Sequence, residues 1–190
     1  MQSILLIDNY DSFTWNLAQL LRETGLCKVT VLANDQIEVD DCGSYNRIII
    51  SPGPGLPFQA GVTCDIIRRW AEEKSILGVC LGHQAIGEVF GAKLIPMDVV
   101  LHGEMQEVVV CDPADRLFGN LPQKFDAGRY HSWTLDAGSF PSCLRITALD
   151  TLGRVMALSH TRFDVKGVQF HPESVMTPHG RQLIENWLVS

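Results

Sequence analysis

The segment SILGVCLGHQ, residues 75–84, is the clearest indication of the fold, because a short apolar run is followed at once by a glycine-flanked cysteine. Residues 75–79 are typical of a buried strand, and the residues that follow have the pattern of a helix. A G-x-C-x-G sequence between a strand and a helix matches the nucleophile elbow, a sharp turn that projects a reactive side chain above a sheet. Gly78 and Gly82 suit this turn, since a Cβ on either would collide with the tightly folded backbone.

The elbow favours a nucleophilic role for Cys80. The helix that follows directs its positive end and its free N–H groups at the sulfur, which favours the thiolate. The backbone N–H of Leu81 is then available to a developing oxyanion. The alternative interpretation is a buried structural cysteine in an ordinary turn, but glycine on both sides favours function.

Strands and helices alternate through the first half of the chain. A helix begins near Asp11 or Ser12, either of which can cap it, and Gly25 ends it. The remaining predicted elements are strands over residues 3–7, 28–32 and 47–50 and helices over residues 63–73 and 83–90. This alternation predicts an α/β fold with a mostly parallel central sheet flanked by helices.

The second half of the chain has a different pattern, with strands predicted over residues 105–111, 142–149, 154–160 and 166–170 and few helices between them. These strands indicate antiparallel additions at the sheet edge or a small second sheet. Residues 178–188 have the pattern of a closing helix. Because we find no repeat and no linker-like stretch, we expect one domain over residues 1–190.

The composition excludes several classes of partner. Of the 190 residues, 46% are hydrophobic, which is enough for a core, and 15 basic against 22 acidic residues give a net charge of −7. We therefore expect neither nucleic acid nor an anionic membrane as a partner. The apolar runs are too short to cross a bilayer, and no basic region precedes the first of them as it would in a secretion signal. The six cysteines form no C-x-x-C pair, so we expect reduced thiols and a cytoplasmic location.

His171 is the histidine best placed to serve as a base for this cysteine. It follows a predicted strand and precedes Pro172 and Glu173. In an extended chain residues i and i+2 project to the same face, so Glu173 can hold the imidazole of His171. The alternative is an ordinary surface pair. His83 is better suited to packing, whereas His131, within the polar sequence RYHS, is placed to border the site.

The loop SPGPG, residues 51–55, follows a strand at the edge where α/β proteins bind ligands. Its glycines allow close approach of backbone N–H groups, which suits a second oxyanion donor or a carboxylate cradle, although a plain connector has the same composition. The phosphate-loop and dinucleotide motifs are missing, so we predict no cofactor. The C-x-x-H pair at 80–83 and the H-x-E pair at 171–173 are weak metal motifs, and we predict no metal.

Taken together, GVCLGHQ, GVQFHPES and SPGPG resemble the class I, triad-type glutamine amidotransferases. The sequences DNYDSFTWNL at residues 8–17 and SPGPGLPFQAG at residues 51–61 narrow this resemblance. They are similar to the glutaminase subunits (component II) of anthranilate synthase and of 4-amino-4-deoxychorismate (para-aminobenzoate) synthase, and YHS at 130–132 is a further match. The resemblance extends from Ile4 to the C-terminal helix.

The resemblance implies a catalytic triad of Cys80, His171 and Glu173, with the backbone N–H groups of Gly53 and Leu81 forming the oxyanion hole. It also implies a glutamine pocket and a heteromeric partner, a larger subunit that binds chorismate and receives the ammonia. The implied pocket residues are Gly53, Pro54, Gly55, Gln84, Ser132 and Trp133.

Two positions depart from the usual family pattern. Glu104 follows His102-Gly103 where lysine is usual, in a segment associated with the partner, and Trp133 replaces a smaller apolar residue, although its backbone can still serve the pocket. The sequence leaves open whether the product is anthranilate, for tryptophan synthesis, or aminodeoxychorismate, for folate synthesis. Two further alternatives are a stand-alone γ-glutamyl hydrolase or peptidase on the same fold and a non-catalytic binding module.

Overall fold

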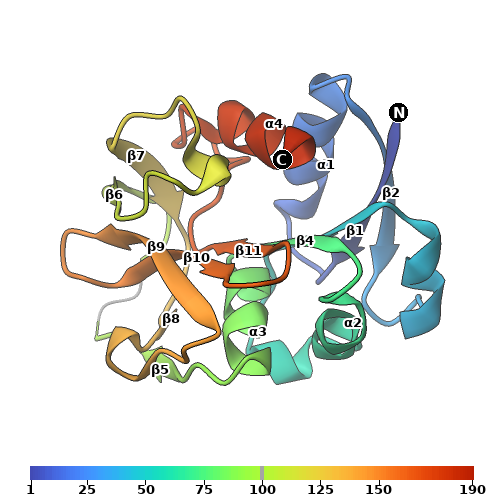
Figure 1. Ribbon diagram of the computed structural model, residues 1–190, viewed down its shortest axis with the longest axis horizontal. Helices are drawn as coiled ribbons and strands as arrows, with labels where there is room; N and C mark the ends of the chain where they lie inside the picture. Colours follow the sequence, from blue (N-terminus) through green and yellow to red (C-terminus); the bar gives the residue numbers. More distant parts are fainter. Residues whose placement is uncertain (99–100) are drawn as a thin grey trace.

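The computed structural model describes residues 1–98 and 101–190, and one long twisted sheet crosses the molecule (Figure 1). Over the described residues this sheet has nine strands in the order β2-β1-β3-β4-β11-β10-β9-β6-β7. Its first part is parallel. The parallel strands are β1 (Gln2–Asp8), β2 (Cys27–Ala33), β3 (Arg47–Ile50), β4 (Ser75–Val79) and β11 (Val165–Val168).

The remaining strands of the sheet pair antiparallel beyond β11. They are β10 (Val155–His160), β9 (Leu144–Asp150), β6 (Glu104–Val110) and β7 (Lys124–Arg129). A small separate sheet pairs β5 (Leu94–Pro96) with β8 (Trp133–Leu135). Antiparallel strands at the sheet edge and a small second sheet, which the sequence left as alternatives, therefore both occur.

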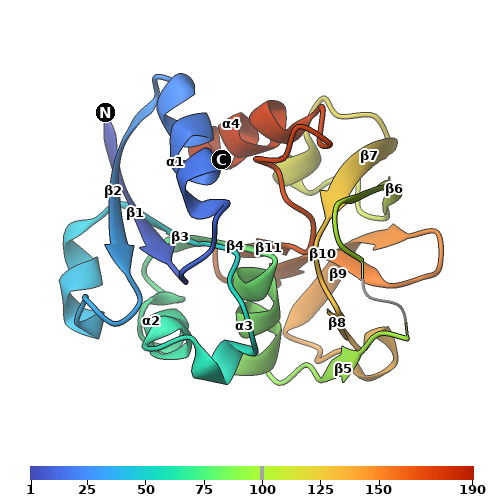
Figure 2. The same ribbon diagram turned by 180° about the vertical axis from the view of Figure 1, so that it is seen from behind.

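Helices cover the parallel part of the sheet on both faces (Figures 1 and 2). α1 (Thr14–Glu23) and α4 (Gly180–Val189) lie on one face, and α2 (Thr63–Trp70) and α3 (Leu81–Val89) lie on the other. Strand β1 is apolar over residues 4–7 because alternate residues of this stretch enter two cores. Leu6 packs in the core with α1 and α4, and Leu5 packs in the core with α2 and α3.

The predicted fold class is confirmed, and the differences are local. α1 begins at Thr14 without a side-chain cap, because the Asp11 carboxylate accepts instead from the N–H of Phe13, 2.8 Å away, in the turn before the helix. α2 ends at Trp70, and β11 ends at Val168. Short 3₁₀ helices occupy Val39–Ser44, Pro57–Gln59, Arg116–Phe118 and Ala137–Ser139. Among the described residues, no helix has both the length and the apolar character needed to span a bilayer.

Candidate active site

Cys80 occupies a strained turn between β4 and α3. Its backbone has φ 52° and ψ −99°, a conformation that residues with a side chain rarely adopt, and its N–H donates to the carbonyl of Val168 at 2.8 Å. A Cβ on Gly82 would lie 2.5 Å from the carbonyl oxygen of Ile50, and a Cβ on Gly78 would meet the backbone of Gly82. The sharp turn and its need for both glycines, predicted from the sequence, are therefore confirmed.

His171 and Glu173 form a buried pair. The Nδ1 of His171 lies 2.7 Å from Oε1 of Glu173, and neither side chain is more than 2% exposed. The predicted contact is present, but the backbone argument for it was wrong, because these residues are not extended. They form a turn, in which the N–H of Ser174 donates to the carbonyl of His171 at 3.2 Å. The turn itself brings the two side chains together.

The surroundings of His171 favour its protonated form. Burial lowers the pKa of the imidazole, but the nearby charge of Cys80 and the hydrogen-bonded Glu173 carboxylate raise it more, from 6.5 to about 10. The aromatic rings of Phe13 and Tyr130 pack against the imidazole at centroid distances of 5.1 and 4.8 Å and hold its plane. His171 is therefore an imidazolium at neutral pH, next to the candidate nucleophile.

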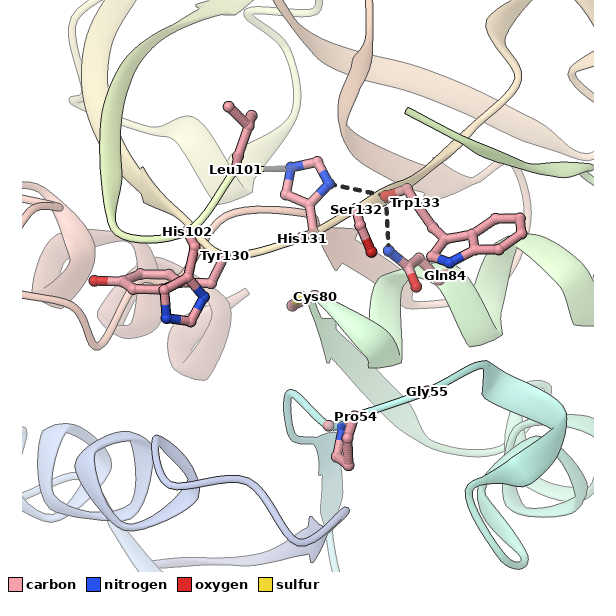
Figure 3. Close-up of a pocket in the computed structure, with 11 residues that line it drawn as sticks. Pro54, Gly55, Cys80, Gln84, Leu101, His102, Tyr130, His131, Ser132 and Trp133 are labelled. Carbon is pink, nitrogen blue, oxygen red and sulfur yellow. Dashed lines mark hydrogen bonds between the residues drawn. The ribbon is translucent and has the colours of Figure 1, made fainter. Parts of the chain in front are cut away.

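A cavity of about 210 Å³ opens beside Cys80. Figure 3 shows Cys80 between the Pro54–Gly55 loop and the segment that carries Tyr130 to Trp133, with Gln84 reaching in from α3. The six predicted pocket residues all line this cavity, namely Gly53, Pro54, Gly55, Gln84, Ser132 and Trp133. His131 also lines it, as predicted, and Leu101 and His102 complete the wall.

The two predicted oxyanion donors lie on adjacent backbone segments. Gly53 packs so closely on Leu81 that an added Cβ would stand 2.6 Å from the Leu81 Cδ2 atom. Leu81 is the first residue of α3, so its N–H belongs to the positive end of that helix. The structure thus brings the loop and the elbow together at the nucleophile.

Trp133 contributes its backbone carbonyl to a hydrogen-bond network behind the pocket. This oxygen accepts from Nε2 of Gln84 at 3.0 Å and lies 2.8 Å from Nδ1 of His131. Because Arg129 Nε donates to His131 Nε2 at 3.1 Å, the ring proton is on Nδ1, which donates to Trp133. Burial and the Arg129 charge lower the pKa of His131 to about 3, so this imidazole is neutral.

His83 is fully buried at the start of α3, and neither of its ring nitrogens has a hydrogen-bond partner among the described residues. Burial lowers its pKa to about 4. This agrees with the packing role expected from the sequence. In the part of the chain that the structure describes, no group of three or more His, Cys, Asp or Glu side chains is arranged to hold a metal ion.

Sequence reasoning missed several residues of the site. The sequence pattern marks Phe13 only as an apolar residue near α1, and it gives no role to Gln169 in GVQFHPES, although Gln169 lies two positions before His171. The Nε2 of Gln169 is 3.6 Å from the Cys80 sulfur. The nearby aromatic residue and the amide in the same motif were available signals, but only the folded chain shows what they contact.

The fold and the site combine an α/β sheet, a strained cysteine elbow and a buried His–Glu pair, and comparison with known proteins identifies the family. Residues 5–190 match the family model for glutamine amidotransferase class-I. The chain therefore belongs to the class I glutamine amidotransferase family.

Individual relatives agree with this family and extend over nearly the whole chain. Anthranilate synthase component 2 of Porphyra purpurea is 45% identical over 190 residues, covering 98% of this chain and 99% of the relative. Aminodeoxychorismate synthase component 2 of Escherichia coli K12 is 42% identical over 187 residues, covering 97% of this chain and 98% of the relative. A crystal structure of a Thermoplasma acidophilum protein, provisionally assigned as one subunit of a GMP synthase, shares the fold with TM-score 0.89 at 24% identity, covering 100% of this chain and 93% of that one.

Proposed function

We propose that residues 1–190 form one glutamine amidotransferase domain that hydrolyses L-glutamine and delivers the ammonia to a chorismate-binding partner subunit, giving anthranilate. The observation that carries the proposal is the strained Cys80 elbow beside the buried His171–Glu173 pair, at the wall of a cavity. The relatives named as component 2 of two synthases support a role within a heteromer.

In this proposal Cys80, His171 and Glu173 are the catalytic triad. The Cys80 thiolate attacks the side-chain amide carbon of glutamine, and the tetrahedral intermediate collapses to a thioester as the C–N bond breaks. His171 Nε2 transfers its proton to the departing nitrogen, which leaves as ammonia. The same imidazole nitrogen then takes a proton from water, whose oxygen attacks the thioester and releases glutamate and the thiolate. Glu173 accepts from Nδ1–H throughout and stabilises the imidazolium.

The oxyanion of each tetrahedral intermediate would accept from the N–H groups of Leu81 and Gly53. Both donors are fixed by the packing of the loop on α3, so little reorganisation accompanies the reaction. Neither step requires a cofactor or a metal ion, since the thiolate is the nucleophile and neither step is an oxidation or a reduction.

The proposed glutamine pocket comprises Gly53, Pro54, Gly55, Gln84, Ser132 and Trp133. The Gln84 amide nitrogen donates to the Trp133 carbonyl and to Oε1 of Gln169. Its own oxygen remains as the acceptor for a donor on the substrate, such as the α-ammonium group. Trp133 takes part through its carbonyl, so its large side chain is compatible with the pocket.

We propose that the larger subunit docks at residues 9–12 and at His102–Gly103. His102 lines the cavity, and Tyr10 is 59% exposed, which makes this a rim that a partner can cover. A covered rim would keep neutral ammonia from solvent, where it would be protonated. We also propose a cytoplasmic location, which the six free thiols support, with neither nucleic acid nor membrane as a partner.

The second candidate function is the same glutaminase role in 4-amino-4-deoxychorismate synthesis, which the 42% identity to the Escherichia coli component supports. The test is to mix the chain with each candidate large subunit, glutamine and chorismate and to identify the product. Anthranilate alone supports the first assignment, and aminodeoxychorismate alone supports the second. A glutaminase rate that no large subunit changes would refute both and favour a stand-alone γ-glutamyl hydrolase.

A further inference from the structure

Gln169 places a side-chain amide directly against the nucleophile. It follows β11 and is fully buried, and its backbone N–H donates to the carbonyl of Met156 in β10 at 2.9 Å. Its Nε2 lies 3.6 Å from the Cys80 sulfur, which is hydrogen-bond distance for a sulfur acceptor. The backbone bond holds Gln169 beside β10, and from there its side-chain amide reaches the sulfur.

The orientation of this amide is set by its neighbours. The Trp133 carbonyl can only accept, so the group that Gln84 presents to it must be its NH₂ group. The same Gln84 nitrogen lies 3.1 Å from Gln169, which must therefore present its oxygen there. If the Gln169 amide were reversed, its NH₂ group would face the NH₂ group of Gln84, and its oxygen would face the sulfur of Cys80. The network accordingly leaves the Gln169 NH₂ group facing Cys80.

We infer that Gln169 is a further catalytic residue, a buried hydrogen-bond donor that stabilises the Cys80 thiolate. This inference rests on the proposed function, in which the thiolate is both the attacking and the leaving group. A donor to an ionised acceptor favours the ionised form, and burial strengthens the effect.

The amide also acts on the leaving group of the second step. The thiolate that leaves the second tetrahedral intermediate faces two groups that stabilise its charge. One is the imidazolium of His171, which has just taken a proton from water, and the other is the N–H of Gln169. Because Gln169 is held by Gln84, the donor stays in place through both steps.

The test measures the chemistry of Cys80 without turnover. We would follow alkylation of Cys80 by iodoacetamide against pH, using mass spectrometry of the Cys80 peptide, in wild type, Gln169→Leu and Gln169→Glu. In Gln169→Leu the half-maximal rate should move about one unit to higher pH, and kcat/KM for glutamine should fall about 10- to 100-fold. Gln169→Glu should move the curve further, because a carboxylate repels the thiolate.

Asn186→Leu is the matched control, since it removes an amide that donates to the carbonyls of Leu117 and Gly119, away from the site. It should lower stability and leave the alkylation curve unchanged. A folded Gln169→Leu with the wild-type curve would overturn the inference, as would an equal shift in Asn186→Leu. If Gln169→Leu does not fold, Gln169→Met, which keeps the length of the side chain and removes the donor without adding a charge, decides by the same criterion. Failure of the proposed function is a separate result, namely glutamine turnover that survives Cys80→Ser.

Discussion

Replacing Gly82 by alanine tests whether the elbow needs its close packing. The new Cβ would stand 2.5 Å from the carbonyl oxygen of Ile50 and 2.9 Å from the Ile50 Cβ, so α3 and β3 must separate by about 1 Å to restore contact. Overpacking of this kind costs about 1–3 kcal/mol of unfolding free energy. A typical domain has about 5–15 kcal/mol, so the variant should still fold.

The kinetic effect of Gly82→Ala should be larger than its effect on stability. A shift of about 1 Å would move the N-terminus of α3, with the Leu81 N–H, relative to Cys80, and a misplacement of that size costs about 100-fold in rate. We would measure urea unfolding and kcat/KM for glutamine in the same preparations.

Gly91→Ala serves as the control, because Gly91 follows the other end of α3 and an added Cβ meets nothing within 4 Å. Its φ of +97° strains any side chain, so the control should lose stability, by about 1 kcal/mol, without losing rate. Wild-type kinetics in Gly82→Ala would show that the close packing does not position the nucleophile.

The remaining predictions concern the triad and the partner. His171→Ala should lose more glutaminase activity than Glu173→Gln, since alanine removes the base whereas glutamine keeps an oxygen near the ring; a fully active His171→Ala enzyme would exclude the triad. The pKa of His171, about 10 in wild type, should be lower in Cys80→Ser, because burial remains while the charge of the thiolate that raises the pKa is removed. NMR titration of both proteins would measure this, and the same pKa in both would refute the proposed ion pair. In wild type the stabilisation from His171 should be complete below about pH 6.5 and lost as the pH rises through about 10. Ser12→Glu should weaken association with the large subunit while leaving the isolated fold intact; an unshifted curve of glutaminase rate against partner concentration would refute the docking surface.

The parts of the fold that follow local rules were predictable from the sequence. The apolar run of β4 and the glycines on either side of Cys80, Gly78 and Gly82, indicate the elbow, because a turn that sharp excludes a Cβ at both positions. The run of residues 47–50 gives β3 with the predicted bounds, since a strand buried on both faces is apolar where it is buried, as Ile48, Ile49 and Ile50 are here.

The missed strands have side chains with mixed preferences. β7 has the sequence KFDAGR, in which alternation is weak and Arg129 indicates a surface position, yet Arg129 is fully buried against Asp150 with a contact of 2.7 Å. β5 and β8 have three residues each and gain their stability from pairing with one another. Such pairings are long-range, so no local pattern marks them.

The candidate site also has a part that was predictable from the sequence and a part that was not. His171 and Glu173 lie close in sequence, so their contact was predictable even though the backbone forms a turn. The chain of contacts from Arg129 through His131 to the Trp133 carbonyl and Gln84 joins β7, α3 and the pocket wall, and only tertiary packing assembles it.

The most direct test of the central claim is to look for the glutamyl thioester on Cys80. Acid-quenched mixtures of enzyme, glutamine and the large subunit would be examined by mass spectrometry of the Cys80 peptide, alongside Cys80→Ser with glutamine and with ammonium. We expect a glutamyl adduct on Cys80 in wild type. We also expect Cys80→Ser to lose at least about a thousandfold in glutamine-dependent activity, with ammonium-dependent synthesis by the large subunit retained. Wild-type glutaminase rates in Cys80→Ser, or a glutamyl adduct on another residue, would contradict it.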